Sequence, residues 1–147
     1  MKLNNIAFLL LVVSALVLVG CTVSTKDSVQ DSPDQYENNT IVKAFYNAMK
    51  SKDYASLEPY YAKEFLESTT KEKIVPFYAG INKKLGNLIE YKVTAASYKR
   101  ALTTGTKTTL LIISSKYEKG DAIETLTIIE RDGKEELLGW NIISDAL

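Results

Sequence analysis

The hydrophobic pattern divides the chain into three parts. Residues 6–19 are apolar apart from Ser14, and they follow a positive charge at Lys2. This run is shorter than the roughly 20 apolar residues of a membrane-spanning helix, and it has the length of the apolar core of a secretory signal. Residues 22–35 are polar and have no apolar period, which indicates a flexible tether. Regular patterns begin after the tether, so residues 36–147 are predicted to form one folded domain.

Helical spacing dominates the first half of this domain. Helices are predicted over residues 39–51 and, in a shorter form, over residues 53–61. One face of the first helix collects the apolar side chains of Ile41, Val42, Phe45, Tyr46 and Met49. Thr69 and Glu72 have the spacing of a capping box, so a third helix is predicted from there to about residue 86. Pro76 is expected to kink or split it.

From residue 88 the apolar period changes from helical to alternating. Strands are predicted over residues 88–95, 106–117, 123–130 and 137–144, separated by turn sequences, with a bulge at Ala95-Ala96. Helices followed by consecutive antiparallel strands predict an α+β fold, with N-terminal helices packed on a curved four-stranded antiparallel meander.

Composition removes several classes of chemistry. The chain of 147 residues carries 18 Lys and Arg against 18 Asp and Glu, so it lacks the basic excess of a nucleic-acid-binding protein. It has no histidine, which excludes a Ser-His-Asp triad, a Cys-His dyad and a histidine-ligated metal site. Its single cysteine cannot form an internal disulfide or a thiolate cluster. We therefore expect no metal, no other cofactor and no nucleic-acid partner.

The end of the apolar run assigns a role to the single cysteine. Leu18-Val19-Gly20-Cys21 resembles the lipobox of bacterial lipoproteins. The resemblance implies cleavage between Gly20 and Cys21 and acylation of Cys21, whose two or three chains would hold the protein on a membrane. It thus implies a signal peptide at residues 1–20 and a lipidated cysteine with its tether at residues 21–35. The alternative is an ordinary signal peptide or an uncleaved anchor in which the cysteine occurs by chance.

The same resemblance implies a location in the cell envelope. Thr22 follows the cysteine, where Gram-negative lipoproteins retained in the inner membrane often carry Asp. A Gram-negative source would therefore place the protein on the periplasmic face of the outer membrane. A Gram-positive source is equally compatible with the motif.

The order of elements in residues 36–147 resembles small nuclear-transport-factor-2-like (cystatin-like) domains, including domains of unknown function in bacterial lipoproteins. The shared pattern is a first helix such as that around Phe45, a helix ending in Leu85-Gly86, an Asp132-Gly133 turn, and the aromatic Trp140 after it. The resemblance implies a cone between the sheet and the helices. In ketosteroid-isomerase-like and polyketide-cyclase-like members, such a cone holds a carboxylate or histidine base, often with a Tyr donor.

Six aromatic residues are candidates for lining this cone: Tyr46, Tyr61, Phe65, Tyr78, Tyr91 and Trp140. The alternative is that they are core aromatics with their hydroxyls at the rim. Among the carboxylates, Glu90, Glu124 and Glu130 fall on strand positions predicted to face solvent. Glu58 and Glu64, near the aromatic residues, are better candidates, with solvated helix positions as the alternative. The sequence assigns no catalytic residue.

We therefore expect a non-enzymatic binding or interaction module that takes an envelope protein or a small apolar ligand. The alternatives are an isomerase- or cyclase-like enzyme using a Tyr and a carboxylate, and a purely structural envelope component. The strand over residues 106–117 has the apolar centre Leu110-Leu111-Ile112-Ile113, so both of its faces need a cover. This predicts a homodimer that packs sheet against sheet.

Overall fold

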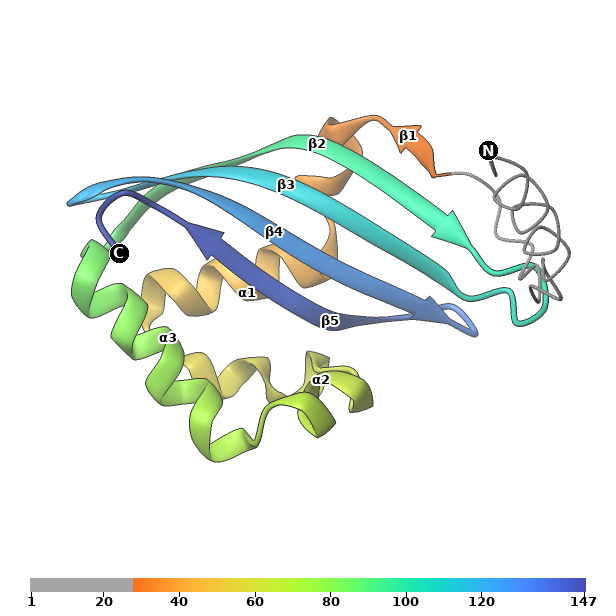
Figure 1. Cartoon of the computed structure of the whole chain (residues 1–147), viewed down its shortest axis with the longest axis horizontal. Helices are drawn as coiled ribbons and strands as arrows, with labels where there is room; N and C mark the ends of the chain where they lie inside the picture. Colours follow the sequence, from red (N-terminus) through yellow and green to blue (C-terminus); the bar gives the residue numbers. More distant parts are fainter. Residues whose placement is uncertain (1–27) are drawn as a thin grey trace, which may run out of the picture.

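The computed structural model describes residues 28–147, so the predicted signal peptide, Cys21 and the first part of the tether lie outside the described residues. Helices lie on one side of a long, curved antiparallel sheet (Figure 1). In chain order the elements are β1 (Val29–Asp31), η1 (Pro33–Tyr36), α1 (Thr40–Ser51), η2 (Tyr54–Tyr60), α2 (Lys63–Ser68), α3 (Lys71–Leu85), β2 (Leu88–Arg100), β3 (Lys107–Tyr117), β4 (Gly120–Arg131) and β5 (Lys134–Ile143), where η denotes a 3₁₀ helix. The predicted α+β class is confirmed, but the sheet has five strands and not four.

The additional strand, β1, comes from the segment predicted to be a flexible tether. Its three residues pair antiparallel with β2, with Val29 opposite Tyr98. The η1 turn follows, and the Tyr36 hydroxyl donates a hydrogen bond to the Asp31 carboxylate at 2.9 Å. A short edge strand is held by backbone hydrogen bonds and needs no apolar alternation, which is why the polar sequence Val-Gln-Asp did not reveal it.

The helices form largely where their patterns predict them. At the start of α1, the Asn39 side chain accepts hydrogen bonds from the backbone N–H groups of Ile41 and Val42, at 2.9 and 3.2 Å. The third helix, α3, runs through Pro76 without being split. The predicted capping box does not form, since the residue before α3 is Thr70 and makes no side-chain cap. The short helix α2 was not predicted.

The strands β2 to β5 form a meander in which each strand pairs with the next. The register of β2 shifts between Val93 and Ala95, one residue before the predicted bulge. Asp132 and Gly133 both have positive φ, 51° and 76°, and join β4 to β5 by a two-residue turn of the kind that Asp-Gly favours.

The hydrophobic core lies between the helices and the inner face of the sheet. On β3, Leu111 and Ile113 are fully buried in this core, whereas Leu110 is exposed on the outer face. Ile123 and Ile143 are also exposed, and they pair with each other across β4 and β5. The homodimer expected through this outer face stays a prediction.

The prediction of which face of β4 carries Glu124 is wrong. Glu124 was expected to face the solvent, but it is 0% exposed, whereas its neighbour Ile123 is 50% exposed. The register explains the reversal, because Glu124 pairs with Ile113 of β3 and Ile142 of β5 on the inner face. By contrast, Glu90 is exposed as expected.

Residues 28–147 contain one continuous core and a five-stranded sheet whose neighbouring strands pair with each other, which is what independent folding of a domain needs. Within this described range, no helix combines the length and the apolarity that crossing a bilayer takes.

Candidate functional site

A carboxyl group buried on the inner face of the sheet collects three hydrogen bonds. Glu124 Oε1 accepts from the Tyr117 hydroxyl at 2.9 Å. Glu124 Oε2 accepts from the Tyr46 hydroxyl at 3.0 Å and from Trp140 Nε1 at 2.8 Å. These donors come from three different elements, α1, β3 and β5, so the carboxyl group ties the first helix to the sheet.

The three donors explain how a carboxyl group can be buried here. Burying such a group without partners is strongly unfavourable, and hydrogen bonds are what offset the lost hydration. The same enclosure acts on the donors. Burial and the nearby Glu124 raise the pKa of the Tyr46 hydroxyl well above 10, and they also raise the pKa of the Tyr117 hydroxyl. Both tyrosines therefore stay protonated and can act as donors across the physiological pH range.

A bulge in β5 places Trp140 on the inner face. Gly139 pairs with Thr127 and Leu137 with Ile128, so Leu138 is an extra residue between two paired positions. Without this extra residue, strand alternation would put Trp140 on the outer face with Gly139 inside. The bulge thus brings the indole N–H to Glu124 and the indole ring against the helices.

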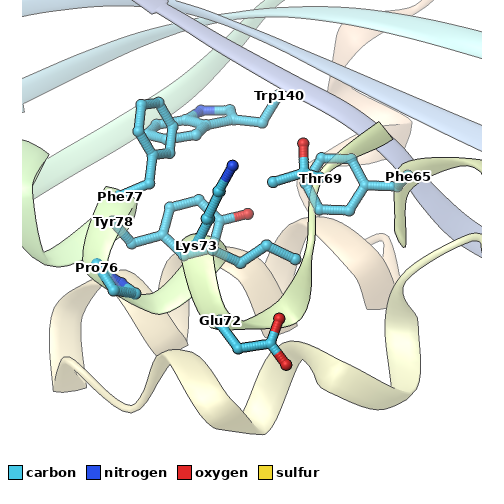
Figure 2. A pocket seen from close by; sticks show the side chains of 9 residues that line it. Phe65, Thr69, Glu72, Lys73, Pro76, Phe77, Tyr78 and Trp140 are labelled. Atoms are coloured by element: carbon cyan, nitrogen blue, oxygen red, sulfur yellow. The ribbon is translucent and has the colours of Figure 1, made fainter. Parts of the chain in front are cut away.

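The indole ring of Trp140 forms one wall of a cleft between β5 and the helices α2 and α3. We call this cleft the aromatic pocket, and its volume is about 590 Å³. The residues that line it are Phe65, Thr69, Glu72, Lys73, Ile74, Pro76, Phe77, Tyr78 and Trp140. Figure 2 shows Phe77 and Tyr78 beside the Trp140 indole, with Phe65 on the opposite side of the cleft. The ring centroids of Phe77 and Tyr78 lie 5.8 and 5.1 Å from that of Trp140.

Helix α3 supplies most of this lining because of its spacing. Lys73 and Phe77 are one turn apart, as are Ile74 and Tyr78, so each pair lies on neighbouring parts of the same helix surface. Ile74 and Tyr78 are buried against the core, whereas Phe77 is 53% exposed. The Phe77 ring thus contacts the Trp140 indole and is also open to solvent beside the cleft.

Three of the six predicted aromatic residues meet at the aromatic pocket, namely Phe65, Tyr78 and Trp140. Tyr61 lies behind it, with its ring 5.0 Å from Phe65 and its side chain buried. Tyr46 and Tyr91 are elsewhere, stacked on each other with centroids 3.8 Å apart. The predicted group is therefore divided between the pocket and the core.

The sequence reasoning missed Phe77, Lys73 and the pair Tyr117 and Glu124. The sequence contained a signal for Phe77 and Lys73, because residues four apart lie next to each other on the surface of a helix. For Glu124, the available signal was the alternation of Ala122, Glu124, Leu126 and Ile128, three of them apolar.

The two carboxylates that were preferred from the sequence do not lie in the core. Glu58 and Glu64 are both exposed, and Glu64 pairs with Arg131. This agrees with the alternative that they are solvated helix positions. Within residues 28–147, no group of three or more potential metal-ligating acidic or cysteine side chains comes together.

Comparison of the chain with protein-family models, with curated proteins and with solved structures finds no match.

Proposed function

We propose that the chain is a lipid-anchored protein of the cell envelope whose domain binds a small apolar molecule in the aromatic pocket, without catalysing a reaction. The observation that carries this proposal is the cleft itself. Its volume of about 590 Å³ lies within the range of roughly 300–1,000 Å³ that is usual for small-molecule sites, and aromatic rings form its walls.

The position of Glu124 favours binding over catalysis. A general acid or base must come within about 2.6–3.2 Å of the proton that it transfers. Glu124 has no exposed surface, and both of its oxygens already accept hydrogen bonds from side chains. The Trp140 indole touches both the carboxyl group and the pocket, so a bound molecule would meet the ring and not the carboxyl group.

The enzymatic alternative has one supporting feature, the buried Glu124 beside two tyrosine hydroxyls. The isomerases and cyclases that the chain resembles in fold also pair a carboxylate with a tyrosine, but their substrate must contact these catalytic groups. In this chain that contact would require Trp140 to leave Glu124. The proposal of a binding module needs no such movement.

Trp140 is the only tryptophan of the chain, so its fluorescence reports directly on the aromatic pocket. The neutral apolar dye 1-N-phenylnaphthylamine, titrated into the segment 28–147, should bind and accept energy from Trp140. The Phe77→Ala variant should weaken binding by roughly tenfold, because it removes one apolar wall worth about 1–2 kcal/mol. Phe77 is half exposed, so the fold should survive the change.

Ile143→Ala is the matched control for this titration. Ile143 is 67% exposed but lies on β5 away from the pocket lining, so its removal should leave dye affinity unchanged. Absence of dye binding up to roughly 100 µM, an affinity near −5 kcal/mol, would contradict the proposed function. So would an equal loss in both variants.

The anchoring part of the proposal rests on Cys21. Cells that express the full chain and are fed labelled palmitate should incorporate label into the protein, and Cys21→Ser should abolish this because serine offers no thiol for acylation. Ser24→Ala, which keeps the cysteine, is the control and should remain labelled. The anchor would be ruled out if the Cys21→Ser protein were labelled, or if the unchanged protein were not.

A further inference from the structure

Lys73 places a positive charge at the aromatic pocket. It lies one turn before Phe77 on α3, and Figure 2 shows its ammonium group on the same side of the helix as Phe77 and Trp140. Among the ion pairs and hydrogen bonds of residues 28–147, none involves the Lys73 side chain. Its charge is therefore available to a ligand.

The other charge that lines the pocket points elsewhere. Glu72 precedes Lys73, and consecutive residues of a helix do not share a face. Figure 2 shows the Glu72 carboxylate across the α3 ribbon from Trp140, whereas the Lys73 ammonium lies toward the ring. Of the two charged groups that line the pocket, the Lys73 ammonium is therefore the one on the side of the aromatic rings.

A second donor lies deeper in the same pocket. Tyr78 is 1% exposed and lines the pocket, and its hydroxyl has no hydrogen-bond partner. The buried Tyr61 hydroxyl has no hydrogen bond of good geometry either, although the two phenols lie near enough for each to affect the pKa of the other. Leaving a buried hydroxyl unpaired costs about 1–3 kcal/mol, so such a group in a native protein needs an explanation. Figure 2 shows the Tyr78 hydroxyl directed toward the side of Thr69 and Phe65, away from the backbone of α3.

We infer that the ligand of the aromatic pocket is an amphiphile with an apolar body and a carboxylate head. This inference rests on the proposed function and specifies its ligand. A carboxylate offers only acceptor oxygens, which match the ammonium of Lys73 and the free hydroxyl of Tyr78. The rings of Phe65, Phe77 and Trp140 would cover the apolar body. A pocket of about 590 Å³ has room for one short acyl chain or a fused-ring acid, and not for a whole diacyl lipid.

Three ligands with the same ten-carbon body separate the head-group chemistries: decanoate, methyl decanoate and decylamine. Each is titrated into the segment 28–147 at neutral pH and low salt, with Trp140 fluorescence as the readout. Decanoate should bind at least tenfold more tightly than decylamine, with the ester between them, because only the carboxylate is attracted by Lys73. Lys73→Gln should reduce decanoate affinity about fivefold and leave the ester unchanged.

Two further variants separate ligand recognition from structure. Lys83→Gln removes an exposed charge from the same helix, away from the pocket lining, and should leave decanoate affinity unchanged. Tyr78→Phe keeps the ring and removes only the unpaired hydroxyl. It should weaken decanoate binding about threefold to tenfold while the thermal unfolding midpoint stays equal or rises. A hydroxyl that served only the fold would give the opposite result.

The outcomes distinguish this inference from the function on which it rests. Equal affinity for the three head groups, or tighter binding of decylamine, would overturn the carboxylate ligand while dye binding still supported an apolar pocket. Loss of binding for all three ligands and for the neutral dye would overturn both. Retention of the decanoate preference in Lys73→Gln and Tyr78→Phe would overturn the assignment of these two donors.

Discussion

At the residue scale, Glu124 shows why single positions in a strand are hard to assign from sequence. The alternating pattern of β4 allows either of two sets of residues to face the core. One set contains Ala122, Leu126 and Ile128, and the other contains Ile123 and Ile129. The polarity of Glu124 favours the second set, because Glu124 then faces the solvent. The structure has the first, because Tyr46, Tyr117 and Trp140 supply the partners that a buried carboxyl group needs. These partners are 78, 7 and 16 residues away, respectively.

Glu124→Gln should destabilise the domain by about 2 kcal/mol. A glutamine amide has one acceptor oxygen where the carboxyl group has two. Its NH₂ group takes the place of the second oxygen and cannot accept the hydrogen bond that this oxygen received. At least one of the three surrounding donors is then left without an acceptor in a buried site. The free energy of unfolding, measured by urea titration of the segment 28–147, is the quantity to compare.

Glu90→Gln is the control for this substitution. Glu90 is the same residue type in β2, but its side chain is exposed, so the change should stay within about 0.5 kcal/mol. Similar losses in the two variants would mean that the hydrogen bonds of Glu124 contribute little to stability. Trp140 emission provides a second readout, because Glu124→Gln changes the group that accepts the indole hydrogen bond, whereas Glu90→Gln does not.

At the element scale, periodicity located the long helices and strands but not the short elements. The amphipathic spacing of α1 and the alternation of β3 are repeated over several turns or pairs, so they stand out from chance. Strand β1 has three residues and α2 has six, which is too few for a period to show. The bulge at Leu138, which orients Trp140, follows from pairing with β4 and leaves no mark in the local sequence.

The end of α1 offers a test of local backbone conformation. Lys52 follows the helix in the left-handed region, with φ 63° and ψ 18°, where glycine is the usual residue. An L-residue with a Cβ is disfavoured there by roughly 1 kcal/mol. Lys52→Gly should therefore raise the free energy of unfolding by about 0.5–1 kcal/mol in urea titrations.

Lys43→Gly, in the interior of the same helix, should have the opposite sign. Glycine there loses more backbone entropy than other residues and lowers helix stability by about 1 kcal/mol. If both glycines destabilise the domain, the left-handed cap at Lys52 is not a source of strain.

At the scale of the whole molecule, the α+β class was predictable and the pocket was not. The order of helices and strands already restricts the architecture to helices on one sheet face. The aromatic pocket instead joins residues of α2, α3 and β5, from Phe65 to Trp140. Its shape depends on how these elements pack and on the register of β5, and a single sequence contains no direct record of either.

Nine tyrosines in a chain of this size give the molecule a distinct response to alkali. Burial raises the pKa of Tyr46, Tyr78 and Tyr117, whose side chains are almost fully enclosed. In the unfolded chain these phenols ionise near pH 10, whereas in the folded protein they keep their protons to higher pH. Below pH 10 both states are protonated, so these groups contribute no pH dependence. Above pH 10 the unfolded state is stabilised relative to the folded state, because its phenols release protons that the folded state retains.

The free energy of unfolding should therefore fall steeply above pH 10. Each enclosed tyrosine contributes a slope of about −1.4 kcal/mol per pH unit, so these three give about −4. Tyr36, Tyr54, Tyr61 and Tyr91, whose pKa values burial also raises, make the slope steeper still. Urea titrations of the segment 28–147 between pH 9 and pH 11.5 measure this slope, and phenolate absorbance shows when the tyrosines ionise. Ionisation of the enclosed groups should coincide with unfolding.

Tyr78→Phe identifies one of these contributions. The variant lacks one enclosed phenol but no hydrogen bond, so its slope above pH 10 should be shallower by about 1.4 kcal/mol per pH unit while its stability near neutral pH is not reduced. Suppose instead that the slope is unchanged, or that all nine phenolates appear near pH 10 while the domain remains folded. The tyrosines would then be open to solvent, and the unpaired Tyr78 hydroxyl would have water as its partner in place of a ligand.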